Sequence, residues 1–114
     1  MSPLLILQLI AVIGTLFTGL FSLIWPDRVT GFTGLHTESG RGITEIRSIL
    51  GGFFVGLAGA AFFLDHAVSY PMLGITYLVV AGVRTVSMFL DDSVVSSNLI
   101  SIGAEVVFGV VLVL

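Results

Sequence analysis

The sequence predicts an all-α integral membrane protein, a four-helix bundle with short loops and one longer loop. Three observations predict this class: the chain of 114 residues is divided into four long apolar runs, 56% of its residues are hydrophobic, and only 10% are charged. An ordinary soluble domain carries about 25% charged residues. The length suits one domain, and we expect a single transmembrane domain over residues 1–114.

The four expected helices follow from the apolar runs alone. Each run approaches the roughly 20 residues that a helix needs to cross the hydrocarbon core of a bilayer. The first run contains no charged residue, and it lacks the positive amino-terminal region and the small-x-small cleavage site of a signal peptide. We therefore expect helices over residues 4–25, 44–64, 71–90 and 94–114, with a long glycine-rich loop over residues 26–43.

Prolines and short polar residues agree with these boundaries. Pro26 follows the first apolar run. Pro71 suits the first turn of the third helix, where the missing N–H of a proline is harmless. The fourth helix has three candidate caps in Asp91, Asp92 and Ser93. The third and fourth helices are therefore expected to form an antiparallel hairpin with a very short turn.

The orientation in the membrane follows from the arginines. Arg28 and Arg41 lie in the long loop, and Arg47 lies just inside the second expected helix. The opposite side has no arginine, only Asp65 and His66. Because cytoplasmic loops carry an excess of Lys and Arg, we expect the long loop in the cytoplasm and both termini outside.

Two opposite charges lie inside apolar runs, Arg84 in the third expected helix and Glu105 in the fourth. A charge in the middle of a membrane-spanning helix costs roughly 2.5–3.5 kcal/mol, so such residues usually face a bundle interior and pair. At 1.5 Å per residue, Arg84 lies about 9 Å and Glu105 about 12 Å below the same end of the hairpin. We therefore predict a bidentate Arg84–Glu105 ion pair.

Two further charges enter the bilayer from the same side in the second expected helix. They extend the predicted pair to an intramembrane charge cluster of Glu45, Arg47, Arg84 and Glu105. One interpretation is that the cluster only fixes the register of the helices, a well-attested role of buried polar groups. The other interpretation is a site for a proton, an ion or a lipid headgroup.

Polar residues recur at helical spacing in the apolar runs. In the first run they are Gln8, Thr15, Thr18 and Ser22, at intervals of seven, three and four residues. Such intervals place a set of side chains on one face of a helix. The stripes indicate either a bundle with a partly polar interior or hydroxyl groups that bond back to carbonyls of their own helices.

The second expected helix is rich in small residues. Gly52, Gly56 and Ala60 form a helix-packing stripe of the small-xxx-small type, which allows two backbones to approach closely. We expect this stripe to pack inside the bundle. The alternative is an interface with a second copy of the chain or with another membrane protein.

Several classes of site are excluded by residue types. The chain contains no cysteine and no lysine, which removes thiolate metal sites, cysteine nucleophiles and Ser-x-x-Lys catalysis. His36 and His66 lie on opposite sides of the expected bundle and cannot form a bis-histidine haem or a zinc site. His66 alone is either an axial ligand to a pigment or haem or an exposed interfacial histidine. We expect no enzyme activity, no catalytic residue and no metal; no cofactor is indicated, and the absence of a basic face argues against nucleic acid.

The segment Glu-Ile-Arg-Ser-Ile-Leu-Gly-Gly, residues 45–52, follows a first span and a loop that contains Pro26. This E-x-R-x-x-x-G-G segment and the glycine-rich helix after it resemble a small bacterial four-span family, the domain-of-unknown-function family numbered 4345, which is DoxX-like in outline. Arg84 and Glu105 also fit its pattern. The resemblance implies a four-helix protein of the bacterial inner membrane and brings no established activity.

Two functions from different classes remain open. The first is a non-enzymatic accessory or structural subunit of a larger respiratory or photosynthetic membrane complex, in contact with lipid and with other subunits or a second copy. Small size, minimal loops and the helix-packing stripe favour it. The second is a small transporter or binding bundle for a proton, ion, lipid or quinone, centred on Arg84 and Glu105. A redox accessory role would rest on the DoxX-like outline alone.

Overall fold

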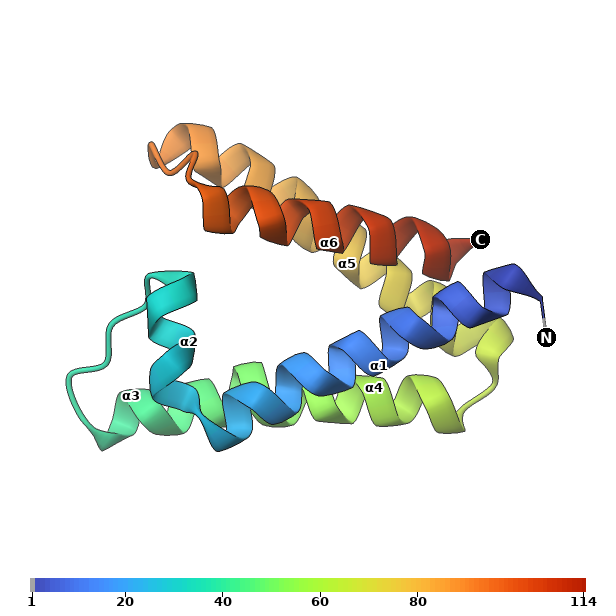
Figure 1. Ribbon diagram of the computed structural model, residues 1–114, viewed down its shortest axis with the longest axis horizontal. Helices are drawn as coiled ribbons and strands as arrows, with labels where there is room; N and C mark the ends of the chain where they lie inside the picture. Colours follow the sequence, from blue (N-terminus) through green and yellow to red (C-terminus); the bar gives the residue numbers. More distant parts are fainter. Residues whose placement is uncertain (1) are drawn as a thin grey trace. The chain divides into compact units, whose positions relative to one another are not determined.

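The computed structural model describes residues 2–114, and over this range the chain is helical, without strands. The all-α class predicted from the sequence is therefore confirmed. The elements in chain order are α1 (Pro3–Ile24), α2 (Pro26–Thr33), α3 (Gly40–Glu45), the π-helix η1 (Ile46–Phe53), α4 (Phe54–Phe63), α5 (His66–Leu90) and α6 (Ser96–Val113) (Figure 1).

Four helical stretches within the described residues are long and apolar enough to cross a membrane. The first and last agree with the expected spans to within two residues at each end. A multi-pass membrane protein is therefore indicated by the structure as well as by the composition. The four stretches are Pro3–Ile24, Gly40–Phe63, His66–Leu90 and Ser96–Val113.

The chain divides into two compact units. The hairpin unit comprises the beginning of α1, up to Ala11, together with residues 64–114, which contain α5 and α6. The proximal unit comprises residues 12–63, with the rest of α1, α2, α3, η1 and α4. The single transmembrane domain expected for the whole chain stays a prediction.

The long loop over residues 26–43 is partly helical. It contains α2, and α3 begins at Gly40. Pro26 occupies the first turn of α2, where its fixed φ favours a helix, and Asp27 lies beside the positive end of the helix dipole. α2 ends at Gly34, whose φ of 77° is a left-handed conformation that glycine adopts without strain.

α5 begins five residues earlier than the predicted start at Pro71. Asp65 is its N-cap, and its side-chain oxygen accepts a hydrogen bond from the Ala67 N–H at 3.1 Å. Pro71 therefore lies inside the helix, not in its first turn, and leaves the Ala67 carbonyl without the usual main-chain donor. The prediction was wrong because the Asp65 cap, which satisfies one of the unpaired N–H groups at the helix start, stabilises an earlier beginning.

The turn between α5 and α6 is closed by the main chain. Asp91 is the C-cap of α5, and Asp92 has a φ of 50°, a left-handed conformation that aspartate tolerates better than most residues. The Ser93 N–H then bonds back to the Met88 carbonyl at 2.9 Å, as in a Schellman motif. α6 begins after Val95, which makes no side-chain cap, so the predicted caps at Asp91, Asp92 and Ser93 were wrong: these residues end α5 instead.

The second span changes helix type along its length. Between α3 and α4, η1 is a π-helix, in which each N–H bonds to the carbonyl five residues back. η1 contains most of the segment that carries the family resemblance, from Ile46 onward. Its wider turns change which residues share a face, so the spacing rule of an α-helix does not hold across it.

Close helix contact in the proximal unit is made by Gly19 of α1 and Gly51 of η1. A Cβ atom on Gly19 would lie 2.8 Å from the Gly51 carbonyl oxygen, and a Cβ atom on Gly51 would lie 3.0 Å from the Cα of Leu23. No larger residue fits at either position, so the two backbones touch.

The helix-packing stripe predicted from the sequence does not make this contact. Gly52, Gly56 and Ala60 are exposed, and a Cβ atom on Gly56 would meet nothing within 4 Å. In the proximal unit, Gly51 supplies the close approach that the stripe was expected to supply.

In the hairpin unit, α5 and α6 run antiparallel and side by side (Figure 1). Their closest approach is at Gly74 and Gly109. A Cβ atom on Gly74 would lie 2.8 Å from the Gly109 carbonyl oxygen, and one on Gly109 would lie 2.7 Å from the side chain of Leu78. These glycines therefore set a near-contact distance between the two helices far from the turn.

The same end of the hairpin is tied to the beginning of α1. Gln8 donates a hydrogen bond from Nε2 to the Val111 carbonyl of α6 at 3.1 Å. Tyr77 and Phe108 pack edge to face across the hairpin, with ring centroids 5.7 Å apart. The hairpin unit thus has an apolar, closely packed end and a turn end, and the candidate site lies toward the turn.

Candidate functional site: an intramembrane arginine–glutamate–asparagine network

Arg84 and Glu105 project from the facing sides of α5 and α6. Arg84 lies six residues before the end of α5, and Glu105 lies nine residues after the start of α6. At 1.5 Å per residue these positions are about 9 and 14 Å from the turn. The long arginine stem bridges this difference in depth, because the turn brings the two helices together as neighbours.

The two side chains form a bidentate ion pair. Arg84 donates from Nε to Oε1 of Glu105 at 2.9 Å and from Nη2 to Oε2 at 2.8 Å. Both distances are those of charge-assisted hydrogen bonds in the planar fork geometry. The predicted bidentate pair is present in the structure, and it joins α5 to α6 across the hairpin.

Asn98 completes the network toward the turn. It accepts a hydrogen bond from Nη1 of Arg84 at 3.1 Å, and its Nδ2 donates to the Ser93 carbonyl at 2.9 Å. A continuous chain of hydrogen bonds therefore runs from Glu105 through Arg84 and Asn98 to the turn residue Ser93. Asn98 was not predicted from the sequence to belong to the site. Its depth could have identified it, because Asn98 lies in the first turn of α6, between Arg84 and the turn of the hairpin.

The carboxylate of the network is buried, whereas its guanidinium is partly accessible. The side chain of Glu105 is 11% exposed and that of Arg84 is 32% exposed. Three of the five guanidinium N–H groups donate to Glu105 and Asn98, and one of the two amide N–H groups of Asn98 donates to Ser93. Two N–H groups of Arg84 and one of Asn98 are outside these four bonds, and lone pairs remain on the oxygens of Glu105 and Asn98.

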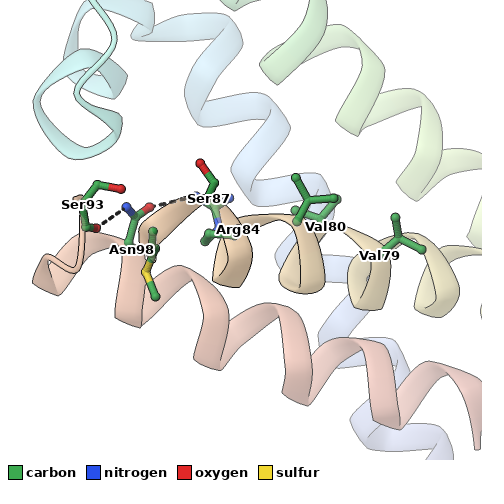
Figure 2. A pocket seen from close by; sticks show the side chains of 8 residues that line it. Val79, Val80, Arg84, Ser87, Ser93 and Asn98 are labelled. Carbon is green, nitrogen blue, oxygen red and sulfur yellow. Dashed lines mark hydrogen bonds between the residues drawn. The ribbon is translucent and has the colours of Figure 1, made fainter. Parts of the chain in front are cut away.

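A groove of about 340 Å³ lies along the same part of the hairpin. One end is polar and lies beside the network, and the other end is apolar (Figure 2). Figure 2 shows Arg84, Asn98 and Ser93 linked at the polar end, with Val79 and Val80 at the apolar end. The groove is lined by Val79, Val80, Val83, Arg84, Ser87, Met88, Ser93 and Asn98.

The other two members of the predicted charge cluster have partners inside the proximal unit. Glu45 forms an exposed ion pair with Arg41, four residues earlier. Arg47 donates from Nη1 to the Leu23 carbonyl at 3.1 Å. Because the last carbonyls of a helix lack main-chain donors, Arg47 satisfies the C-terminal end of α1. The grouping of all four charges joins residues of both units, and it stays a prediction.

Two hydroxyl groups of the polar stripe in the first span bond to carbonyls of their own helix, which is one of the two arrangements expected from the sequence. Thr18 donates to the Gly14 carbonyl at 2.9 Å, and Ser22 donates to the Thr18 carbonyl at 3.0 Å. Each hydroxyl group therefore bonds back to its own helix. Gln8 differs, because its amide reaches a neighbouring helix.

The histidine singled out from the sequence lies at the start of α5. His66 is exposed, and its ring stacks on that of Tyr70 with centroids 4.2 Å apart. Among residues 2–114, no three histidine, aspartate or glutamate side chains come close enough together to hold a metal ion.

Comparison with known proteins returned no matching family, no matching characterised protein and no matching solved structure. The resemblance to the domain-of-unknown-function family numbered 4345 stays an expectation from residues 45–52.

Proposed function

We propose that the chain is a non-enzymatic membrane protein that acts as an accessory or structural subunit of a larger respiratory or photosynthetic membrane complex. The observation that carries this proposal is the closed form of the network. Both carboxylate oxygens of Glu105 accept bonds from one guanidinium. The pairing of Glu105 with Arg84 fixes the register of α5 against α6.

The uncovered small-residue stripe supports a role in assembly. Gly52, Gly56 and Ala60 are exposed, and the proximal unit makes its own close contact through other glycines. Small residues on an exposed face of a membrane-spanning helix allow another helix to approach closely. The partner is another membrane subunit or a second copy of the chain.

The proposal includes a location in the bacterial inner membrane, with the long loop on the cytoplasmic side and both termini outside. The placement of Arg28, Arg41 and Arg47 supports it. The chain has no cysteine, so single cysteines at Gly31 and at Ser2 can be labelled in intact cells with a membrane-impermeant maleimide. Labelling at Ser2 and protection at Gly31 is expected, and the reverse pattern would contradict the orientation. Kinship with the four-span family named above belongs to the same proposal.

Purification of the native protein in a mild detergent tests the subunit role. We expect a particle much larger than one 12.0 kDa chain, containing other polypeptides, whose absorbance spectrum shows whether a respiratory or photosynthetic complex is present. A colourless particle with one or a few copies of this chain alone would contradict the proposal. The exposed apolar faces of the helices require detergent throughout.

A second candidate is a small transporter or a binding bundle for a proton, ion, lipid or quinone centred on Arg84 and Glu105. The groove beside Arg84 favours binding within this class, because it brings unused donors to an apolar channel. Replacing Arg84 by Leu separates the two candidates. Loss of ligand binding or transport in a protein that stays folded and assembled would favour the second, and loss of stability alone would favour the first.

A further inference from the structure

The groove on the hairpin changes in polarity along its length. Val79, Val80 and Val83 of α5 line the part of the groove that lies farther from the turn and therefore deeper in the bilayer. Ser93 and Asn98 line the part beside the turn. A ligand that fits this order has an apolar chain directed away from the turn and polar groups directed toward it.

The donors of the network select the polar groups of such a ligand. Two N–H groups of Arg84 and one of Asn98 lie outside the hydrogen bonds of the network, and each of them requires an acceptor. The charge of Arg84 is already balanced by Glu105. An uncharged acceptor, such as an ester carbonyl oxygen, therefore fits the polar end better than an anion does.

The charges near the turn select the headgroup. Between Arg84 and Glu105 the only charged residues are Asp91 and Asp92, both of them exposed. Asp91 also accepts a hydrogen bond from Ser87, a residue that lines the groove, at 2.6 Å. Within residues 64–114, Arg84 is the only Lys or Arg, and Glu105 already pairs with it, so the two aspartates attract an ammonium group and repel an anionic headgroup.

The depth of the network agrees with that of lipid esters. α5 has 25 residues and is therefore about 37 Å long, somewhat more than the roughly 30 Å of the hydrocarbon core. If α5 is centred in the bilayer, each end extends about 4 Å beyond the core, which leaves Arg84 about 5 Å inside its edge. Lipid ester carbonyls lie at this boundary, within reach of a guanidinium.

We propose that the groove binds a zwitterionic glycerophospholipid with an amine-bearing headgroup. Its ester carbonyl accepts hydrogen bonds from Arg84 and Asn98, its acyl chain follows the valines of α5, and its ammonium group lies at the two aspartates of the turn. This inference names a ligand class for the second candidate function and rests on it. It does not depend on the subunit role.

Native mass spectrometry of the protein in detergent tests this proposal with two bulky variants. Val83 and Val86 are 65% and 59% exposed on the same helix, but only Val83 lines the groove. We expect the unaltered protein and Val86→Trp to retain one phospholipid per chain, and Val83→Trp to lose it. Equal retention in all three proteins, or no retained lipid in the unaltered protein, would overturn the proposal.

Defined lipids then test the headgroup. After delipidation, phosphatidylethanolamine and phosphatidylglycerol with identical acyl chains are added back separately. We expect tighter binding of phosphatidylethanolamine by about fivefold, the factor that corresponds to about 1 kcal/mol, and loss of this preference in Asp91→Asn/Asp92→Asn. Asparagine keeps the capping and left-handed geometry of both positions, so the variant changes only the charge.

Two further outcomes would overturn the proposal in distinguishable ways. A retained isoprenoid quinone, with no phospholipid, would leave the binding function standing and refute the lipid. A melting temperature much lower in Val83→Trp than in Val86→Trp would show that the groove is a packing surface for the rest of the chain, and would refute binding itself.

Discussion

Removing one member of the Arg84–Glu105 pair should destabilise the hairpin more than removing both. In Glu105→Leu, the guanidinium stays in an apolar span with Asn98 as its only partner from the network. The cost of a lone charge in such a span is about 3 kcal/mol. Arg84 is 32% exposed and lies six residues from the end of α5, so its side chain reaches the boundary of the bilayer. We therefore expect the cost of Glu105→Leu to lie somewhat below this value.

The double variant Arg84→Met/Glu105→Leu removes the charge together with its partner. An ion pair replaced by apolar residues of similar volume is often neutral in stability. We therefore expect the double variant to lie within about 1 kcal/mol of the unaltered protein, with a coupling energy between the two sites of about 2–3 kcal/mol. The two hydrogen bonds between Arg84 and Glu105 supply this coupling, because both carboxylate oxygens pair with N–H groups of the same guanidinium.

Unfolding in mixtures of a mild detergent and dodecyl sulfate, followed by circular dichroism, measures these energies. The matched control is the pair Arg41–Glu45, which joins the same residue types four positions apart but is 72% and 54% exposed. The same cycle there should give a coupling of no more than about 0.5 kcal/mol. A coupling energy at Arg84–Glu105 as small as that of the control would refute the reasoning that the pair holds the hairpin.

Three smaller perturbations test other contacts by the same unfolding assay. Gly109→Val places its Cβ atom 2.7 Å from a side chain of α5 and should cost about 2 kcal/mol of unfolding free energy. At Gly82 a Cβ atom meets nothing within 4 Å, so Gly82→Val should cost much less. Equal losses in the two variants would contradict the glycine contact. Arg47→Met removes the donor to the last turn of α1 and should cost about 1 kcal/mol, and an unchanged stability would show that water replaces it. Asp65→Ala should cost about 1 kcal/mol through the lost cap, with Asp65→Asn as the conservative control that restores it.

The membrane spans and the ion pair were predictable because each depends only on the positions of residues along the sequence. Hydropathy along the sequence determines which stretches can cross a bilayer, whatever the helices later contact. Depth along the axis of a hairpin is likewise a matter of counting residues from a short turn. Arg84 and Glu105 could therefore be paired from their distances to the turn alone.

The helix faces were not predictable in the same way, because a face depends on the rotation of a helix about its axis. The stripe of Gly52, Gly56 and Ala60 assumes α-helical rotation from its first residue, yet Gly52 lies in the π-helix η1. The close contact falls instead on Gly51, one residue earlier. A shift of one residue turns the contact face by about 100°, which is enough to move the contact with α1 off the expected stripe.

The start of α5 and the cap of α6 were missed for a related reason. Rules for proline and for caps rank residues by average preference, and Pro71 has a good average fit to a first turn. In this chain the Asp65 cap competes with that preference and prevails. At the other turn, Asp92 ends α5 in a left-handed conformation, so the polar residues thought to begin α6 close the preceding helix.

The network and the glycine contact lie at different depths of the hairpin, and the groove lies beside the network. Where Gly74 meets Gly109, no side chain separates α5 from α6, so the helices are as close as their backbones allow. Nearer the turn, a guanidinium, a carboxylate and an amide join the two helices by hydrogen bonds. The ion pair therefore joins the helices beside the groove, which Arg84 and Asn98 line. Stability and binding then separate in one protein: Arg84→Met/Glu105→Leu should keep the fold and lose the lipid, whereas loss of neither would mean that the network serves no purpose at this groove.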